Sequence, residues 1–99
     1  MIEWLLYALF AGTVAAAVVF IAYLTISVIR DYIRKIRTEK VVKQHSMILK
    51  KKLPNGNYTV VTGFFDDGDT EISDAQAWEA NKIDAAIDRL PNDEIIVLR

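Results

Sequence analysis

Residues 4–29 carry no charged side chain, and this run of 26 residues constrains the fold more than any other feature of the sequence. An α-helix of that length would extend about 39 Å, whereas the hydrocarbon core of a bilayer is about 30 Å thick. Tryptophan and tyrosine lie near both ends of the run, as they do in the interfacial belts of membrane helices. Because 99 residues are too few to bury such a helix in a globular core, we predict a single-pass transmembrane helix in residues 1–29.

A cleaved signal peptide is the alternative explanation of this run, because Ala15, Ala16 and Ala17 resemble a small-residue cleavage site. Against it, the N-terminal flank has no basic residue, and the apolar run continues for 12 residues beyond Ala17. Six Lys and Arg residues follow the run within residues 30–43, so the positive-inside rule places the C-terminal part in the cytoplasm and the N-terminus outside. The predicted location is the plasma (inner) membrane.

Small residues recur every fourth position in the predicted span, at Ala8, Gly12 and Ala16. Such a stripe allows a second helix to approach closely, so it predicts packing against another membrane protein or a second copy of this chain. The span contains no Asp, Glu, Lys, Arg or His, the groups that proton relays and ion pathways use. Transport by this helix alone is therefore not expected.

The segment after the span is strongly basic, and residues 30–43 are predicted to form a juxtamembrane helix or neck. Arg30, Arg34 and Arg37 fall on one stripe of that helix. Two interpretations stay open: the basic residues only fix the topology, or they bind anionic membrane lipid. The residues concerned are Arg30, Arg34, Lys35, Arg37 and Lys40. Nucleic acid is not expected as a partner, because the net charge is −1 and no stacking aromatic residues alternate with these charges.

Two runs rich in β-forming residues, 46–53 and 57–65, flank an Asn-Gly pair. This pattern is typical of a β-hairpin with a two-residue type I′ turn, in which both central residues have positive φ. We therefore predict a positive φ at Gly56 and a pairing of Leu53 with Tyr58 across the turn.

The next regular segment is predicted to be a helix over residues 74–90. Ser73 and Gln76 match a capping box at its start, and Pro91 follows its end. Apolar residues recur at helical spacing on one side of it. The segment 94–98 is too short to form a further helix, so we predict that it forms a third strand.

Residues 44–99 are thus expected to form a small cytoplasmic α+β domain with the order ββαβ. A right-handed crossover from the second strand makes the third strand parallel to the second. Beside the first strand, the third would be antiparallel. We therefore predict a three-stranded sheet of order 2-1-3 packed by one helix. The helix is expected to cover the face that carries Met47, Leu49, Tyr58, Val60 and Phe64.

Two features of this domain suggest binding. Trp78, Asn81 and Ala85 share the outer side of the predicted helix; Trp78 either covers the neighbouring loop or belongs to a partner surface with the other two. Residues 66–71 contain four acidic residues. These form either a cation site or a solvated connection, although their spacing does not fit an EF-hand loop.

Catalytic chemistry is not indicated. The chain has no cysteine, one histidine (His45) and no phosphate-binding glycine loop, so we predict no catalytic residue, cofactor or metal. The predicted function is a small membrane-anchored interaction protein, an accessory subunit or adaptor of a membrane complex. The alternative is an oligomerising, membrane-permeabilising protein of the pore-forming, holin-like kind, and a tethered enzyme is a third hypothesis.

Overall fold

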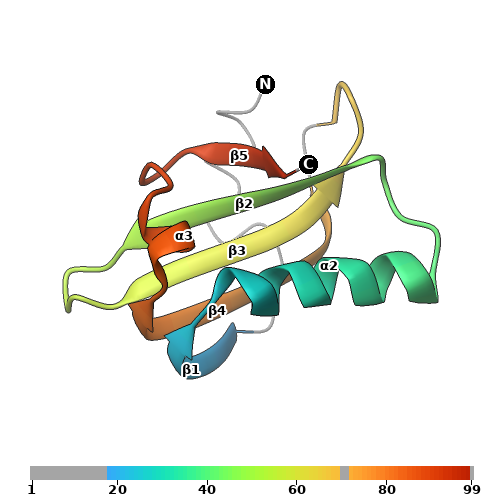
Figure 1. Ribbon diagram of the computed structural model, residues 1–99. Coiled ribbons are helices and arrows are strands. Elements are labelled where there is room, and N and C mark those ends of the chain that lie inside the picture. Colours follow the sequence, from blue (N-terminus) through green and yellow to red (C-terminus); the bar gives the residue numbers. More distant parts are fainter. Residues whose placement is uncertain (1–17, 70–71, 99) are drawn as a thin grey trace.

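The computed structural model describes residues 18–69 and 72–98, and these form one mixed β-sheet with two helices (Figure 1). In chain order the elements are β1 (Val18–Leu24), α2 (Ile26–Glu39), β2 (His45–Lys52), β3 (Tyr58–Phe65), β4 (Ser73–Ile83), α3 (Ala85–Asp88) and β5 (Ile95–Leu98). The sheet has the order β1-β4-β3-β2-β5. Strand β1 runs parallel to β4, and all other neighbouring strands are antiparallel.

The prediction of a single transmembrane helix in residues 1–29 is wrong. Val18–Leu24 form strand β1, and helix α2 begins only at Ile26. No helix in the described ranges, 18–69 and 72–98, is long and apolar enough to cross a membrane. The single-pass fold class, and the membrane location and orientation that depend on it, are overturned by this finding. An apolar run without periodicity does not by itself distinguish a helix from a strand, and β-branched and aromatic residues favour the strand here.

Strands β2 and β3 form the expected hairpin, but its register differs from the prediction by one residue. Lys52, not Leu53, pairs with Tyr58. The turn is one residue longer than predicted, because Leu53 accepts a hydrogen bond from Gly56 N–H and donates its own N–H to Asn57. Gly56 has φ +89°, which confirms the positive φ predicted there. The wider turn suits the proline that precedes the Asn-Gly pair, since proline fits the first central position of a type I turn.

This shift of one residue changes which side chains share a face of the sheet. Met47 and Leu49 belong to one buried cluster and Val60 to another, whereas the predicted register placed them together. Trp78 lies in the same cluster as Val60, and it packs against Tyr32 of α2. The helix therefore covers the Val60 face and not the Met47 face.

Residues 73–83 form strand β4, so the helix predicted over residues 74–90 is wrong except for the short α3. Strand β4 lies between β1 and β3 and is hydrogen bonded on both sides. Pairing on two sides and burial of Ala77 and Trp78 on opposite faces outweigh the helical propensity of the segment. Strand β5 pairs antiparallel with β2, but the sheet continues through β4 to β1. The predicted three-stranded sheet is therefore also wrong.

Two apolar clusters form the core, one on each face of the sheet. Side chains of successive strand residues point to opposite faces, which separates the clusters. The first consists of Met47, Leu49, Val61, Phe65, Ile72, Ala77 and Ile95. The second consists of Leu24, Ile29, Ile48, Val60, Trp78, Ala80 and Ile87. Helices α2 and α3 contribute Ile29 and Ile87 to the second cluster, so both helices pack on the same face (Figure 1).

Candidate functional site

A groove of about 390 Å³ lies between α2 and the strands β2 and β5, and it is rich in arginine. Its lining residues are Arg30, Ile33, Arg34, Arg37, Thr38, Ser46 and Leu98. We call it the arginine groove. The three arginines are spaced by four and three residues, so they share one side of the helix. None of the lining residues is acidic, so the groove offers positive charge, two hydroxyl groups and two apolar side chains.

Two of the three arginines are available to a ligand. Arg30 is exposed and makes no hydrogen bond or ion pair with any described residue. Arg34 donates a hydrogen bond of 3.1 Å to Asp31, but the two side chains are 76% and 70% exposed. An ion pair this exposed contributes little to stability and is easily exchanged for another partner.

Arg37 is held in place at one end of the groove. Its guanidinium lies 5.0 Å from the centre of the Phe64 ring. It also donates hydrogen bonds of 3.4 Å and 3.1 Å to the carbonyl oxygens of Lys43 and Gln44. A guanidinium has five N–H donors, so donors remain for a ligand. Arg37 is therefore a positioned cation, whereas Arg30 and Arg34 can adjust.

The opposite side of α2 is fastened to strand β4 at Asp74. Tyr32 donates a 2.7 Å hydrogen bond to the Asp74 carbonyl oxygen, and Lys40 forms an ion pair with the Asp74 carboxylate. The Tyr32 ring also meets Trp78 edge to face, with ring centres 5.9 Å apart. Asp74 itself has φ +53°, a conformation unusual for a residue other than glycine. These contacts hold the helix so that its arginines face the groove.

The same contacts shift two pKa values. Burial raises the pKa of the Tyr32 phenol above its ordinary 10.0, and the negative charge of Asp74 raises it further. The hydrogen bond to Asp74, followed by its charge, raises the pKa of Lys40 above 10.5. At neutral pH both groups therefore keep the protons that these contacts require.

Asp84 fixes the start of α2 and of α3 at the same time. Its Oδ2 accepts a 3.0 Å hydrogen bond from Ile26 N–H, in the first turn of α2. Its Oδ1 accepts a 3.0 Å hydrogen bond from Ile87 N–H and so caps α3. Sequence analysis missed this residue because Ser73 was the expected cap. An aspartate directly before a helix-forming Ala-Ala pair is the feature that could have indicated it.

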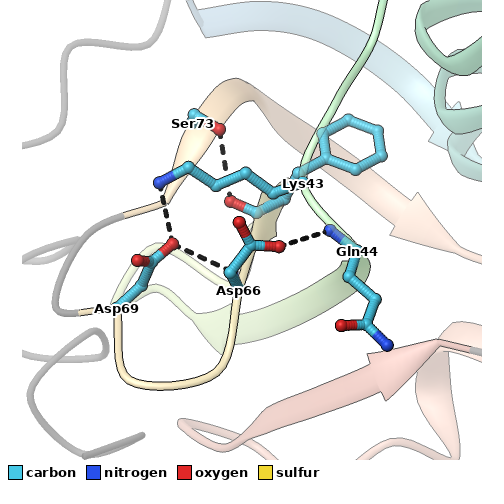
Figure 2. A network of polar contacts seen from close by, with 6 residues as sticks. Lys43, Gln44, Asp66, Asp69 and Ser73 are labelled. Atoms are coloured by element: carbon cyan, nitrogen blue, oxygen red, sulfur yellow. Dashed lines mark hydrogen bonds and ion pairs between the residues drawn. The ribbon is translucent and has the colours of Figure 1, made fainter.

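The acidic loop after β3 closes onto the segment that leads into β2 (Figure 2). Asp66 accepts a 2.7 Å hydrogen bond from Gln44 N–H, and Asp69 accepts one of 2.8 Å from Asp66 N–H. Lys43 donates to the same Asp69 carboxylate at 2.7 Å. The Lys43 hydrogen bond, followed by the Asp66 N–H, lowers the pKa of Asp69 below 3.8. His45 lies 3.0 Å from Asp67.

These contacts favour a structural role for the acidic loop over the cation-site hypothesis. A lysine ammonium already occupies the position beside Asp69 that a cation would take (Figure 2). In the described parts of the chain, no three His, Cys, Asp or Glu side chains are grouped as metal ligands. Residues 70 and 71 of the predicted site lie outside those parts.

The structure separates the five basic residues predicted to act together. Arg30, Arg34 and Arg37 line the groove, whereas Lys40 pairs with Asp74 on the fastened side. Lys35 is exposed and does not line the groove. Sequence analysis missed the groove walls from β2 and β5, because only the folded sheet brings them beside α2.

The structure places the three residues predicted for a partner surface on two elements, with Trp78 and Asn81 in β4 and Ala85 in α3. Trp78 is only 5% exposed and belongs to the core, so its assignment to that surface is wrong. Asn81 is exposed and donates a 3.2 Å hydrogen bond to Asn57, and Ala85 is exposed at the start of α3. The stripe predicted for helix packing lies outside the described residues; it consists of Ala8, Gly12 and Ala16.

Comparison with known proteins gives no family for this chain. No protein-family model matches it, and neither a curated protein sequence nor a solved structure matches it. The functional inference therefore depends on the geometry of the arginine groove.

Proposed function

We propose that this chain is a non-catalytic binding module whose arginine groove takes an acidic segment of a protein partner. The observation that carries the proposal is a row of three arginines along one open groove that has no acidic lining residue. Arginine binds carboxylates through two parallel hydrogen bonds, which gives both strength and direction. The three arginines therefore favour a partner with a peptide segment rich in Asp or Glu.

The spacing of the arginines favours an extended segment. Arg30 and Arg34 are separated by about 6 Å along the helix axis, and Arg34 and Arg37 by about 4.5 Å. Alternate side chains of an extended peptide are about 6.7 Å apart and point the same way. Glutamates at every second position come close to the roughly 6 Å step between Arg30 and Arg34, and the long arginine side chains can span the larger difference at Arg37. The side chains between them point the other way, toward the wall of the groove that carries Leu98 of β5.

The chemistry of the lining supports binding over catalysis. Arginine stays protonated at physiological pH and therefore cannot act as a general base or nucleophile there. Thr38 and Ser46 supply hydroxyl groups, but none of the described lining residues is a His, Cys, Lys, Asp or Glu that could act as the base to activate them. Anionic lipid is a less favoured ligand, because Lys40 is paired with Asp74 and lines a separate hollow, which it shares with Arg37 but not with Arg30 or Arg34. The pore-forming alternative depended on the transmembrane helix and is not carried further.

The proposal is tested by binding of a labelled peptide in which glutamate alternates with valine, measured by fluorescence anisotropy on the full chain. Arg34→Gln removes one groove charge, and Lys35→Gln removes the same charge from the neighbouring exposed residue. We expect Arg34→Gln to weaken binding about tenfold or more and Lys35→Gln less than about twofold, because a charged hydrogen bond contributes about 1.5–3 kcal/mol.

A peptide with glutamine in place of glutamate serves as the matched ligand control and should bind far more weakly. Equal loss of affinity in the two variants would show attraction to net charge and not to the groove. Equal binding of the two peptides, or no binding of the acidic one, would also reject the proposal.

A further inference from the structure

Strand β1 is an open edge of the sheet in the described structure. It pairs with β4 on one side, and no described strand lies on its other side (Figure 1). Such an edge presents backbone N–H and C=O groups that another strand can pair with. Proteins protect edges of this kind with charged residues, with proline or by keeping the strand short. Val18–Leu24 contain no charge and no proline, and they extend over seven residues.

Five of the seven residues of β1 are exposed, whereas Ile21 is half-buried and Leu24 is fully buried. Phe20 is 74% exposed and Tyr23 is 53% exposed, while Val18 and Val19 are 49% and 45% exposed. The opposite edge of the sheet differs, because β5 has only four residues, of which Ile95 is buried and the other three are half-buried. The two edges of the sheet therefore differ, and β1 is the longer and more exposed edge, which favours pairing with another strand there.

We propose that β1 pairs with β1 of a second copy of this chain, antiparallel across a two-fold axis. The occupant that fits is an uncharged apolar strand of similar length with an edge that no described strand covers, and β1 itself meets each condition. Because the strand carries no charge, two copies meet without repulsion, whereas the basic helix α2 could not pair with itself in this way. The contact is self-complementary, as a two-fold interface must be.

The side-chain pattern of β1 fits a pairing centred on Ile21. Phe20 then lies opposite Ala22 of the partner subunit, which sets the largest exposed side chain against a small one. Val19 lies opposite Tyr23 of the partner subunit, a β-branched and aromatic pair of the kind that stabilises antiparallel strands. Seven residues form about seven backbone hydrogen bonds over about 23 Å. In each copy the pairing occupies the β1 edge that no described strand covers, so this contact closes at two copies.

Sedimentation equilibrium of the purified full chain over a range of concentrations tests this proposal. We expect a dimer for the native chain and about tenfold or greater weakening of the dimer for Phe20→Lys, because a charge enters the paired edge. Val41→Lys is the control, since Val41 is 99% exposed but lies in the connection between α2 and β2. That variant should remain a dimer, and circular dichroism should show that both variants are folded.

A second measurement uses the absence of native cysteine. The variant Ile21→Cys should form a disulfide between two copies under mild oxidation, because Ile21 is the centre of the proposed pairing. Ala85→Cys, at an exposed site on α3, should not form it efficiently. A native chain that is monomeric at all concentrations would overturn the proposal. So would growth into assemblies beyond two copies, or a dimer unaffected by Phe20→Lys.

Discussion

The two sides of helix α2 carry the same kind of charge but use it differently. On the fastened side, Lys40 and Tyr32 are bound to Asp74, and Ile29 is fully buried. On the groove side, Arg30 and Arg34 are exposed and keep donors for a ligand. Contact with the sheet, and not the charge itself, decides which basic residues hold the fold and which are available for binding. The comparison predicts that changes on the fastened side lower stability, whereas changes on the groove side affect binding.

The largest expected effect is on the fastened side at Trp78, which packs against Tyr32. Trp78→Ala leaves a cavity in the cluster under α2, so we expect the free energy of unfolding to fall by about 3–5 kcal/mol. Urea denaturation followed by circular dichroism measures it. Asn81→Ala, a change at an exposed residue three positions along β4, should cost less than about 0.5 kcal/mol. Unchanged stability in Trp78→Ala would place the indole outside the core.

The next effect is expected at Asp84, which fixes the start of α2. Asp84→Ala removes acceptors for Ile26 N–H and Ile87 N–H, so we expect a loss of about 2 kcal/mol in the free energy of unfolding. Asp84→Asn keeps one acceptor oxygen and should recover part of the loss. Asp88→Ala, at an exposed acidic residue of α3, is the control and should cost less than about 0.5 kcal/mol. Equal costs at the two positions would mean that Asp84 does not cap both helices.

The smallest effect is the alkaline pH dependence of the fastened side. Tyr32 and Lys40 have folded-state pKa values above 10.0 and 10.5, so their contribution is complete below about pH 10. It is lost as the pH rises through the folded-state values, because the unfolded chain releases these protons first. We expect the free energy of unfolding to fall more steeply above pH 10 in the native chain than in Tyr32→Phe/Lys40→Met. Parallel pH profiles would show that Asp74 does not bind these two groups.

Local patterns predicted part of this structure. The Asn-Gly pair placed the β2–β3 hairpin and the positive φ of Gly56, because turn geometry depends on a few adjacent residues. Helical spacing likewise placed Arg30, Arg34 and Arg37 on one stripe, and the structure shows all three in one groove. Both features are properties of short segments and need no knowledge of the rest of the fold.

The features that failed depend on contacts between distant residues. Val18–Leu24 pair with β4, and β4 lies between β1 and β3, so both strands have partners that are distant in the sequence. Asp84 binds Ile26 across 58 positions of sequence, a pairing that no local pattern reveals. The groove also needs Ser46 and Leu98, which reach α2 through the order of the sheet. Sequence patterns therefore indicated the arginines but not the site that they form.

The roles assigned to the two sides of α2 require that the chain changes from strand to helix at Thr25. A designed disulfide tests this change directly. Tyr23 and Lys82 are paired neighbours of β1 and β4, and both side chains are exposed. Paired strands lie about 4.8 Å apart, within the Cα separation that a disulfide requires. Because the chain has no native cysteine, Tyr23→Cys/Lys82→Cys should form one disulfide within a single chain under mild oxidation. Tyr23→Cys/Lys35→Cys should form none. Failure of the first pair to cross-link in the folded chain, as expected if the helix continued back through Tyr23, would contradict the account.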